Sequence, residues 1–308
     1  MIYTVTLNPA LDIVFYSDEL KTSEYNSTST TQKFPGGKAI NVSRTLYNLG
    51  IPSVATGFLG GYPGKFIFDW FNNRKVENYF VEIEQDTRIN VRIKTKNDKL
   101  TIAGVYPSVT ESQIDQLLFF LSRVREGDIV VMGGSVPSEV SPTIYQRLID
   151  ICNANKAYFV IDIPPVQMMD SLRYRPLLIK PNAESLALMF NRSKPFSNEE
   201  EIIEHGLKCI KIGARNVIVS MGEEGSYLFT EDLSVYRSYA VKGVEVNSFN
   251  SRDAMIGAFI GLYMKKNDPV ESFKMASAAA SATAFVEDIA SKSEILDAFE
   301  KTVVKKIR

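Results

Sequence analysis

The stretch "DIVVMGG", residues 128–134, is a continuously apolar run that ends in two glycines. A strand that is covered on both faces has this pattern, so the run predicts a central strand of a parallel sheet. Helix-like segments lie before it at 110–124 and after it at 143–155, and another apolar strand, "AYFVIDIPP", follows at 157–165. Strands that alternate with helices predict an α/β fold, with a mostly parallel sheet and helices on both faces.

The same alternation reaches both ends of the chain, from a β-rich opening at 2–7 to a largely helical end after Ser251. Two segments, about 13–34 and 87–106, differ because polar and apolar residues alternate in them. A strand with one face in water alternates in this way, and the polar turn "KND" at 96–98 makes the second segment a hairpin. We expect both segments to form a small β layer that projects from the core as a lid.

The composition is ordinary for a soluble globular protein, because 45% of the 308 residues are hydrophobic and 23% are charged. The 35 lysines and arginines balance 36 aspartates and glutamates, so no basic surplus points to nucleic acid or to an acidic membrane. The opening residues have no basic leader, and no run of about 18 apolar residues occurs. We therefore expect a cytoplasmic protein that binds neither nucleic acid nor membranes.

The rarest reactive side chains exclude some reaction classes. Cys152 and Cys209 lie in apolar, helix-like contexts and are expected to be buried free thiols. His205 is the one histidine, and we expect it on the solvated side of a helix over 198–213. A Ser-His-Asp triad or a site with several histidine ligands would have to be built around this single residue.

Polar residues and glycines that follow the apolar strands are the candidates for a ligand site, because open α/β sheets bind ligands at the carboxyl ends of their strands. Each expected strand contributes a group of this kind. The groups are Asp12; Gly36, Gly37, Lys38 and Asn41; residues 133–137; Asp162; residues 180–185; residues 220–225; and Asn250, Ser251, Arg252 and Asp253.

The motif "PGGK", residues 35–38, lies just before an expected helix. Backbone N–H groups at a helix start, together with a lysine, suit an anion or a polyol. A plain glycine turn is the competing interpretation, and the motif alone does not exclude it.

Arg88, Asn90 and Arg92 occupy alternate positions of an alternating strand, so their side chains share one face. Two guanidinium groups on one face suit the recognition of a phosphate group. The alternative is a solvated face of the hairpin.

Asp253 lies at the start of an expected helix, directly after Arg252. It could simply cap the helix, because the first N–H groups of a helix lack partners. It could instead act as a base that deprotonates a hydroxyl group while those N–H groups bind a phosphate. The local sequence leaves both roles open.

Taken together, the motifs resemble those of the ribokinase-like sugar kinases, in the phosphofructokinase-B branch, nearest to the 1-phosphofructokinases and the tagatose-6-phosphate kinases. The resemblance covers nearly the whole chain in order. It rests on "TLNPALD", "PGGKAINVSRTLYNLG", "TRINVRIK", "GGSVP", "LLIKPN", "VIVSMGEEG" and "NSFNSRDAMIGAF". It implies that residues 1–308 form a single ribokinase-like kinase domain whose β lid pairs with that of a second copy in a homodimer.

The resemblance also implies an activity, the ATP- and Mg²⁺-dependent phosphorylation of a ketohexose phosphate such as fructose 1-phosphate or tagatose 6-phosphate. Asp253 then corresponds to the general base, with Arg252 beside it in the catalytic stretch. The residues implied to bind the sugar phosphate are Asp12, Gly36, Gly37, Lys38, Asn41, Arg88, Asn90 and Arg92. Those implied to bind the nucleotide are Asn182, Ser220, Gly222, Gly225, Asn250 and Ser251, with the alanine-rich helix at 276–285 near the adenine.

The sequence departs from the family pattern where phosphoryl transfer would occur. The family has G-A-G-D where this chain has Asn250, Ser251, Arg252 and Asp253. Glycine lets successive N–H groups turn towards a phosphate. Three roles remain open for Arg252: an ion pair with Asp253 that lowers the pKa of that acid, occupation of the γ-phosphate position, or stabilisation of the transferring charge.

A second departure concerns the metal. The family's magnesium-linked pattern is N-x-x-E, but the third residue after Asn182 is Ser185, and Glu184 comes one residue early. One residue is about 100° of rotation on a helix, so Glu184 is a candidate metal ligand with an altered direction. Because the sugar side is intact and the transfer side is changed, the alternative function is a sugar-phosphate-binding pseudokinase or regulator.

Overall fold

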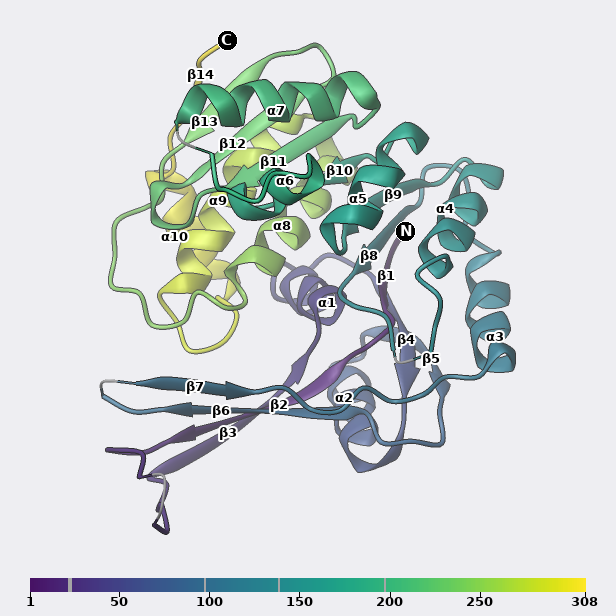
Figure 1. The fold of residues 1–308 in the computed structure, drawn as a ribbon, viewed down its shortest axis with the longest axis vertical. Helices are drawn as coiled ribbons and strands as arrows, with labels where there is room; N and C mark the ends of the chain where they lie inside the picture. The colour runs from purple at the N-terminus through teal and green to yellow at the C-terminus, as the bar shows by residue number, and fades with distance from the viewer. Residues whose placement is uncertain (22–23, 97, 138, 197) are drawn as a thin grey trace.

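The computed structural model describes residues 1–308 except 22–23, 97, 138 and 197. It contains a ten-stranded sheet with helices on both faces and a separate four-stranded sheet (Figure 1). This arrangement confirms the predicted α/β class with an additional small sheet. Among the described residues, no helix combines the length and the apolar character that crossing a membrane requires.

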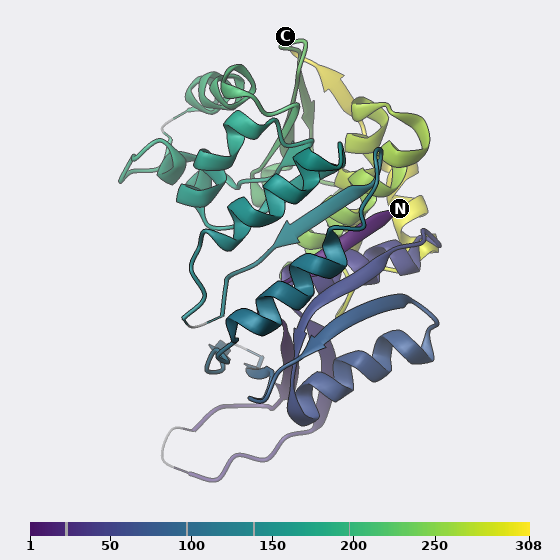
Figure 2. The ribbon, with the colours of Figure 1, turned by 90° about the vertical axis from the view of Figure 1, so that its right-hand side faces the viewer.

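The large sheet has the strand order β14-β13-β12-β11-β10-β9-β8-β1-β4-β5. The strands from β11 to β5 pair in parallel, whereas β12, β13 and β14 add an antiparallel edge. That edge lies far from the small sheet (Figure 2). The strands are β1 (Ile2–Thr6), β4 (Val54–Leu59), β5 (Glu77–Glu82), β8 (Ile129–Gly133), β9 (Tyr158–Asp162), β10 (Leu178–Ile179), β11 (Asn216–Ser220), β12 (Ser226–Thr230), β13 (Val235–Ser238) and β14 (Val304–Lys306).

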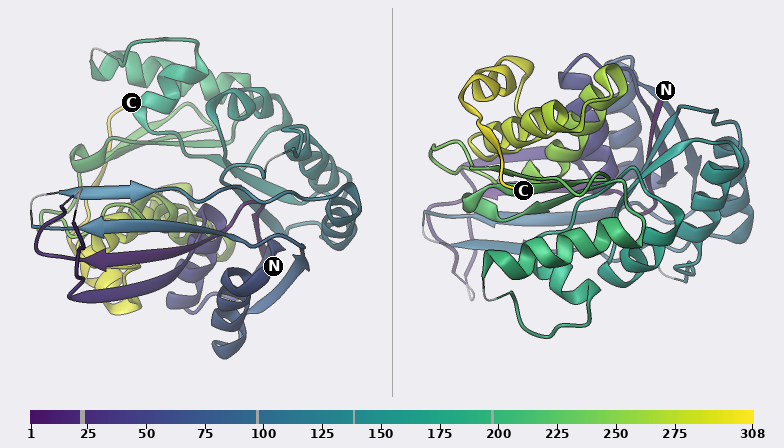
Figure 3. Two further views of the ribbon diagram at one scale, coloured as in Figure 1. Left: turned by 60° about the horizontal axis from the view of Figure 1, so that its bottom comes forward. Right: turned by 90° about the horizontal axis from the view of Figure 1, so that it is seen from above.

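Two layers of helices cover the large sheet (Figure 3). The apolar run at 128–134 contains β8, and every residue of β8 is buried. Val130 and Met132 pack with the layer that contains α3 (Glu111–Leu121), α4 (Ile144–Ala154) and α7 (Glu199–Ile212), whereas Val131 packs with the other layer. Helices α5 (Pro165–Ser171) and α6 (Ala183–Met189) complete this first layer. The second layer includes α1 (Lys38–Asn48), α2 (Gly61–Asn73), α8 (Ser251–Lys266) and α9 (Pro269–Ala284). Helix α10 (Lys292–Lys301) packs on α9.

The small sheet has the order β3-β2-β6-β7 and projects from the core. Its strands are β2 (Ala10–Tyr16), β3 (Thr30–Gly36), β6 (Arg88–Lys94) and β7 (Lys99–Ile102). The strands extend beyond the predicted boundaries 13–34, because Ala10 pairs with Gly36. Residues 103–106, at the end of the second predicted segment, are outside the strands. The chain thus passes from β1 in the large sheet to β2 in the small one within a few residues.

The prediction for His205 was wrong. The residue is 8% exposed, and its ring lies 4.8 Å from the rings of both Phe190 and Phe196. Its Nδ1 lies 2.7 Å from the carbonyl oxygen of Glu201, one turn earlier in α7. The segment before α7 brings these aromatic rings over the helix, which the pattern of α7 alone does not reveal. The expectation that both cysteines are buried and free is confirmed.

Helix α8 packs directly against α1, and this contact positions the first turn of α8. Every residue of α8 from Asp253 to Gly261 is buried. A Cβ atom on Gly257 would lie 2.9 Å from the Cβ atom of Thr45 in α1 and 3.1 Å from the carbonyl oxygen of Val42. Gly257 is therefore present because the two helices approach too closely for a side chain at that position.

We predict that Gly257→Ala lowers the free energy of unfolding, although alanine is the better helix former by about 1 kcal/mol. Overpacking of this kind typically costs about 1–3 kcal/mol, and here α8 would have to move away from α1. Lys265→Ala, at an exposed position of the same helix, should change stability by less than about 0.5 kcal/mol. Urea unfolding followed by circular dichroism measures both, and equal stability of Gly257→Ala and the unmodified protein would contradict the packing argument.

Candidate active site

Two cavities meet at the carboxyl ends of the parallel strands. The first, of about 670 Å³, lies between the small sheet and the start of α8, and we call it the small-sheet cavity. The second, of about 790 Å³, runs along residues 238–245 and α9, and we call it the α9 cavity. Asn182, Ser248 and Arg252 line both.

The structure brings most of the predicted site residues to these cavities. Those that line the small-sheet cavity are Asp12, Gly37, Lys38, Asn41, Arg88, Asn90, Arg92, Asn182, Arg252 and Asp253. Those that line the α9 cavity are Asn182, Glu184, Ser220, Gly222, Gly225, Ser251 and Arg252. Most of the residues assigned to the sugar and most of those assigned to the nucleotide therefore line different cavities.

Gly36 and Asn250 are the two predicted site residues absent from both linings. A Cβ atom on Gly36 would lie 2.6 Å from the carboxylate of Asp12, so this glycine leaves room for that side chain. Asn250 is buried and precedes α8, where its side chain accepts a 3.3 Å hydrogen bond from Asn41 and donates one of 3.4 Å to Asp288. Gly36 and Asn250 therefore contact other side chains of the site, Asp12 and Asn41, without lining a cavity themselves.

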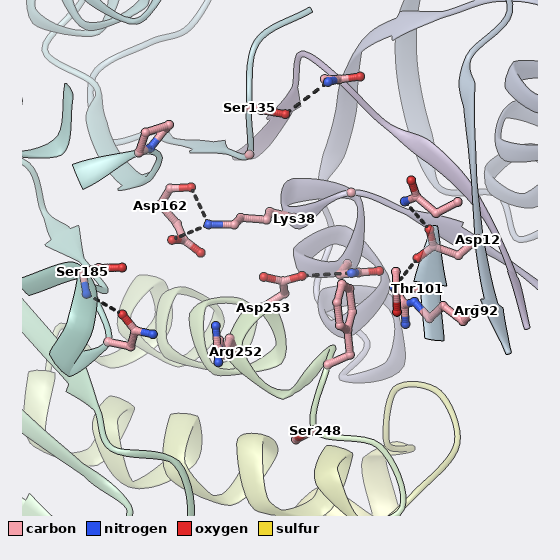
Figure 4. A pocket seen from close by; sticks show the side chains of 18 of the residues that line it. Asp12, Lys38, Arg92, Thr101, Ser135, Asp162, Ser185, Ser248, Arg252 and Asp253 are labelled. Carbon is pink, nitrogen blue, oxygen red and sulfur yellow. Dashed lines mark hydrogen bonds and ion pairs between the residues drawn. The ribbon is translucent and has the colours of Figure 1, made fainter. Parts of the chain in front are cut away.

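The "PGGK" motif forms the start of α1. Gly37 has a φ angle of 117°, which favours glycine, and a Cβ atom there would lie 2.8 Å from a methyl group of Thr6. The next residue, Lys38, donates a 2.9 Å hydrogen bond from Nζ to a carboxylate oxygen of Asp162 (Figure 4). The motif is therefore a turn that also directs a cation into the cavity.

The small sheet contributes a hydrogen-bonded group around Asp12. Asn90 lies opposite Asp12 in the register of β2 and β6 and donates a 2.8 Å bond to it. Arg92 donates a 2.9 Å bond to the other carboxylate oxygen. Arg88 donates bonds to the backbone carbonyls of Asn8 and Pro9. The predicted single face is confirmed, because Arg88, Asn90 and Arg92 all line the same cavity.

Burial raises the pKa of Asp12, although the positive charge of Arg92 and the hydrogen bond from Asn90 act in the opposite direction. Because the carboxylate already has these two partners, it fixes the positions of both side chains. Asn90 and Arg92 also line the small-sheet cavity, where their amide and guanidinium groups can donate hydrogen bonds to a ligand.

Asp253 is not the cap of α8. Asn250 occupies the N-cap position, and Asp253 is the third residue of the helix. Its carboxylate accepts a 2.9 Å hydrogen bond from Nδ2 of Asn41 in α1, and the residue is 5% exposed. Of the two roles left open by the sequence, capping therefore does not account for this side chain.

The surroundings of Asp253 raise its pKa to about 7. Burial is the main cause, and the negative charge of Asp162 adds to it. The hydrogen bond from Asn41 and the charges of Lys38 and Lys180 act in the opposite direction. A carboxyl group with a pKa near neutrality can take up and release a proton at physiological pH, which is what acid–base catalysis requires.

Lys180 lies in the group 180–185 that was expected at the rim, but it was assigned no individual role from the sequence. It follows β10 directly, is 2% exposed, and its Nζ lies 3.9 Å from Asp162, which also pairs with Lys38. Burial tends to raise the pKa of Asp162, but Lys180 and Lys38 outweigh it and hold that pKa below its usual value. Burial also lowers the pKa of Lys180. The sequence signal that could have indicated this role is a lysine directly after the apolar run "PLLI", residues 176–179.

Arg252 is exposed at the place where the two cavities meet. Although it precedes Asp253, the structure contains no ion pair between these two described residues: the carboxylate of Asp253 bonds to Asn41 instead. Figure 4 shows Arg252 and Asp253 as separate side chains on the first turn of α8. Asn250, at the first position where the family has glycine, has a φ angle of −86° and so fits without left-handed geometry. The changed stretch therefore forms a regular helix start.

Glu184 and Ser185 face different cavities, as the rotation between neighbouring helix positions predicts. Glu184 lines the α9 cavity and Ser185 the small-sheet cavity. The backbone N–H of Ser185 donates a 2.7 Å bond to the side chain of Asn182, which caps α6. Within the described part of the chain, no three histidine, cysteine, aspartate or glutamate residues come together as metal ligands.

A comparison with protein families matches residues 5–295 to the pfkB family of carbohydrate kinases. The chain belongs to this family. A 1-phosphofructokinase of Bacillus subtilis is 36% identical over 94% of each chain, and a D-tagatose-1-phosphate kinase of Bacillus licheniformis is 36% identical over 96% of each chain. The family resemblance seen in the sequence is confirmed, but the tagatose relative is a 1-phosphate kinase rather than a 6-phosphate kinase.

Solved structures of sugar kinases share the fold of this pfkB family member. Phosphofructokinase-2 from Escherichia coli, in complex with substrates and products, superposes with a TM-score of 0.91 over 97% of this chain and 98% of its own, at 22% identity. Ribokinase from Arabidopsis thaliana, complexed with ribose and ATP, has a TM-score of 0.77 over the same shares, at 20% identity. The ribokinase-like fold is therefore confirmed, and the kinase is a sugar-phosphate kinase by its relatives.

The raised pKa of Asp253 predicts how stability depends on pH. Between pH 4 and 7 the folded protein keeps a proton on Asp253 that the unfolded chain has lost, so this group's contribution to stability falls as pH rises through its folded pKa of about 7. Asp253→Asn removes this dependence. The stability of the variant relative to the unmodified kinase should therefore increase by about 2–3 kcal/mol from pH 5 to pH 8.

Urea unfolding at both pH values measures the difference. The exposed Asp297→Asn is the matched control and should show no change with pH. A difference for Asp253→Asn that stays constant from pH 5 to pH 8 would show that the carboxyl group is not protonated in the folded state.

Proposed function

We propose that this kinase transfers the γ-phosphoryl group of ATP to a hydroxyl group of a ketohexose phosphate, with Asp253 as the general base. The supporting observation is a buried carboxyl group with a pKa of about 7 that lines one cavity next to its junction with the other. The carboxylate takes the hydroxyl proton while the hydroxyl oxygen bonds to the γ-phosphorus. The bond from the γ-phosphorus to the bridging oxygen breaks, and ADP leaves with that oxygen.

The small-sheet cavity suits the phosphorylated sugar. Arg88, Arg92 and Lys38 provide positive charge there, and Asn41 and Asn90 provide amide groups. Guanidinium groups bind phosphate through paired donors. The two relatives named for their substrates act on fructose 1-phosphate and tagatose 1-phosphate, so we favour a ketohexose 1-phosphate. Tagatose 6-phosphate, which the sequence resemblance suggested, is a competing substrate in the same chemical class.

The α9 cavity suits ATP. Gly225 has a φ angle of 94°, and a Cβ atom there would lie 2.1 Å from the carbonyl oxygen of Ser238, so the chain turns closely along the cavity wall. Ser277, Ala280 and Ser281 of the alanine-rich helix also line this cavity. Small side chains leave room for a planar base, and we place the adenine beside them, with the phosphates towards Ser251 and Arg252.

Magnesium in such enzymes keeps several waters and is held by one or two carboxylates together with the substrate phosphates. Glu184, which lines the α9 cavity, fits this description. Asp162 fits less well because Lys38 and Lys180 already pair with it, and Ser185 offers only a hydroxyl group. We infer that Glu184 faces a hydrated Mg²⁺, which would neutralise phosphate charge when bound.

We infer that two copies pair through the small sheet. All four residues of β7 are exposed, including Leu100 and Ile102. In the described four-stranded sheet, β3 and β7 each have a neighbour on one side only. Exposed sheet edges with apolar side chains favour pairing with a second copy.

A turnover assay tests the proposed reaction. With Mg²⁺ and ATP, ADP release should be fastest with fructose 1-phosphate or tagatose 1-phosphate, and slower with tagatose 6-phosphate or fructose 6-phosphate. Asp253→Asn should lower kcat by about 10²–10⁴-fold, because it removes the general base. The exposed Asp297→Asn should leave it unchanged. If no sugar phosphate yields ADP although calorimetry detects its binding, the pseudokinase alternative replaces the kinase reaction.

A variant of Arg252 separates stabilisation of charge from obstruction. If the guanidinium stabilises the transferring phosphoryl group, Arg252→Ala should lower kcat by about 10²–10³-fold, the usual loss for one preorganised donor. Arg252→Lys should retain part of the activity because it keeps the charge. Steady-state kinetics with saturating ATP measures both variants. Faster turnover of Arg252→Ala would mean that the side chain blocks the γ-phosphate position.

A further inference from the structure

We propose that Phe249 is a positioning residue that joins the phosphate-binding face of the small sheet to the catalytic start of α8. The inference rests on the proposed function, because it assigns Phe249 a part in binding the sugar phosphate. It adds a residue outside the sets that the sequence motifs single out for sugar, nucleotide or metal.

The direct contact is a stack between Phe249 and Arg92. The guanidinium carbon of Arg92 lies 3.5 Å from the centroid of the Phe249 ring. Arg92 is 7% exposed, its Nε atom is buried without a hydrogen-bond partner among the described residues, and its one ion pair is with Asp12. The ring therefore covers one face of the guanidinium group, while Asp12 holds one edge.

Phe249 is a large apolar residue whose side chain is not buried in the hydrophobic core. It is 56% exposed and lines the small-sheet cavity. It lies directly before Asn250, the N-cap residue of α8, and four positions before Asp253. The contact with Arg92 therefore connects β6 of the small sheet to the turn that carries the proposed base.

A second connection runs in parallel with the first. Glu287 accepts a 2.8 Å hydrogen bond from Lys94 in β6 and a 2.5 Å bond from Tyr16 in β2. The backbone carbonyl of Glu287 accepts a 2.8 Å bond from the side chain of Asn247, two residues before Phe249. The small sheet thus contacts the 247–249 turn directly through Arg92 and indirectly through Glu287.

These contacts make the orientation of Arg92 depend on the turn, and the position of the turn depend on the small sheet. A guanidinium group stacked on an aromatic ring keeps its donors in one plane, which favours binding of a phosphate through paired N–H groups. Loss of the ring should weaken the binding of the sugar phosphate while nucleotide binding in the α9 cavity is unaffected.

Three substitutions at position 249 separate the aromatic contact from mere bulk. Phe249→Leu keeps an apolar side chain without the ring, Phe249→Ala removes both, and Phe249→Tyr keeps the ring. Phe119→Ala is the matched control. Phe119 lies on α3, is also exposed, and lines neither cavity. Its ring centroid lies 5.2 Å from the guanidinium carbon of Arg123. Calorimetry measures the Kd of fructose 1-phosphate and, separately, of the non-hydrolysable ATP analogue AMP-PNP.

We expect Phe249→Ala and Phe249→Leu to raise the Kd of fructose 1-phosphate by about three- to tenfold, which lies within the range for a cation–π contact. Phe249→Tyr and Phe119→Ala should leave it within about twofold, which is below that range. AMP-PNP should bind all variants equally. Unchanged sugar-phosphate binding by Phe249→Leu, or an equal loss for both ligands in Phe249→Ala, would overturn the proposal. If the unmodified protein binds no ketohexose phosphate, the proposed function itself fails.

Discussion

The site depends on one buried group of charges at the carboxyl ends of the strands. Asp162 ends β9 and pairs with Lys180, which follows β10, and with Lys38, which begins α1. A buried carboxylate without partners would be strongly destabilising, so the two lysines hold these chain segments together. The negative charge of Asp162 also raises the pKa of Asp253. The charged group that stabilises the rim therefore adds to the effect of burial on the pKa of the proposed base.

The fold places the two cavities on either side of that group. The small sheet presents Asp12, Asn90 and Arg92 as a connected unit, and α9 lines the opposite cavity with small residues. The first turn of α8 lies between them because Gly257 allows α8 to approach α1 closely. A substrate hydroxyl group and a nucleotide phosphate can therefore meet at a helix start that faces both cavities.

Sequence patterns were sufficient for the parallel core, for the existence of the small sheet and for most of the rim. The apolar run of β8 and the alternation in β6 have local causes, so they predicted the parallel core and the shared face of Arg88, Asn90 and Arg92. The contacts between distant segments could not be predicted in this way. The Asp253–Asn41 bond spans 212 residues, and no local pattern specifies it. Residues 180–185 were expected at the rim, but the pairing of Lys180 with Asp162 could not be predicted for the same reason. The aromatic rings that cover His205 come from outside its helix.

A carbon-13 NMR titration of the Asp253 carboxyl group tests the central claim most directly. The claim is that burial and the neighbouring charge of Asp162 raise the pKa of this acid to near neutrality. The unmodified kinase should show a pKa of about 7, and Asp162→Asn should lower it, because the variant removes the neighbouring negative charge. A pKa near the ordinary value of about 3.9 in the unmodified protein, or no change on removing Asp162, would contradict this account.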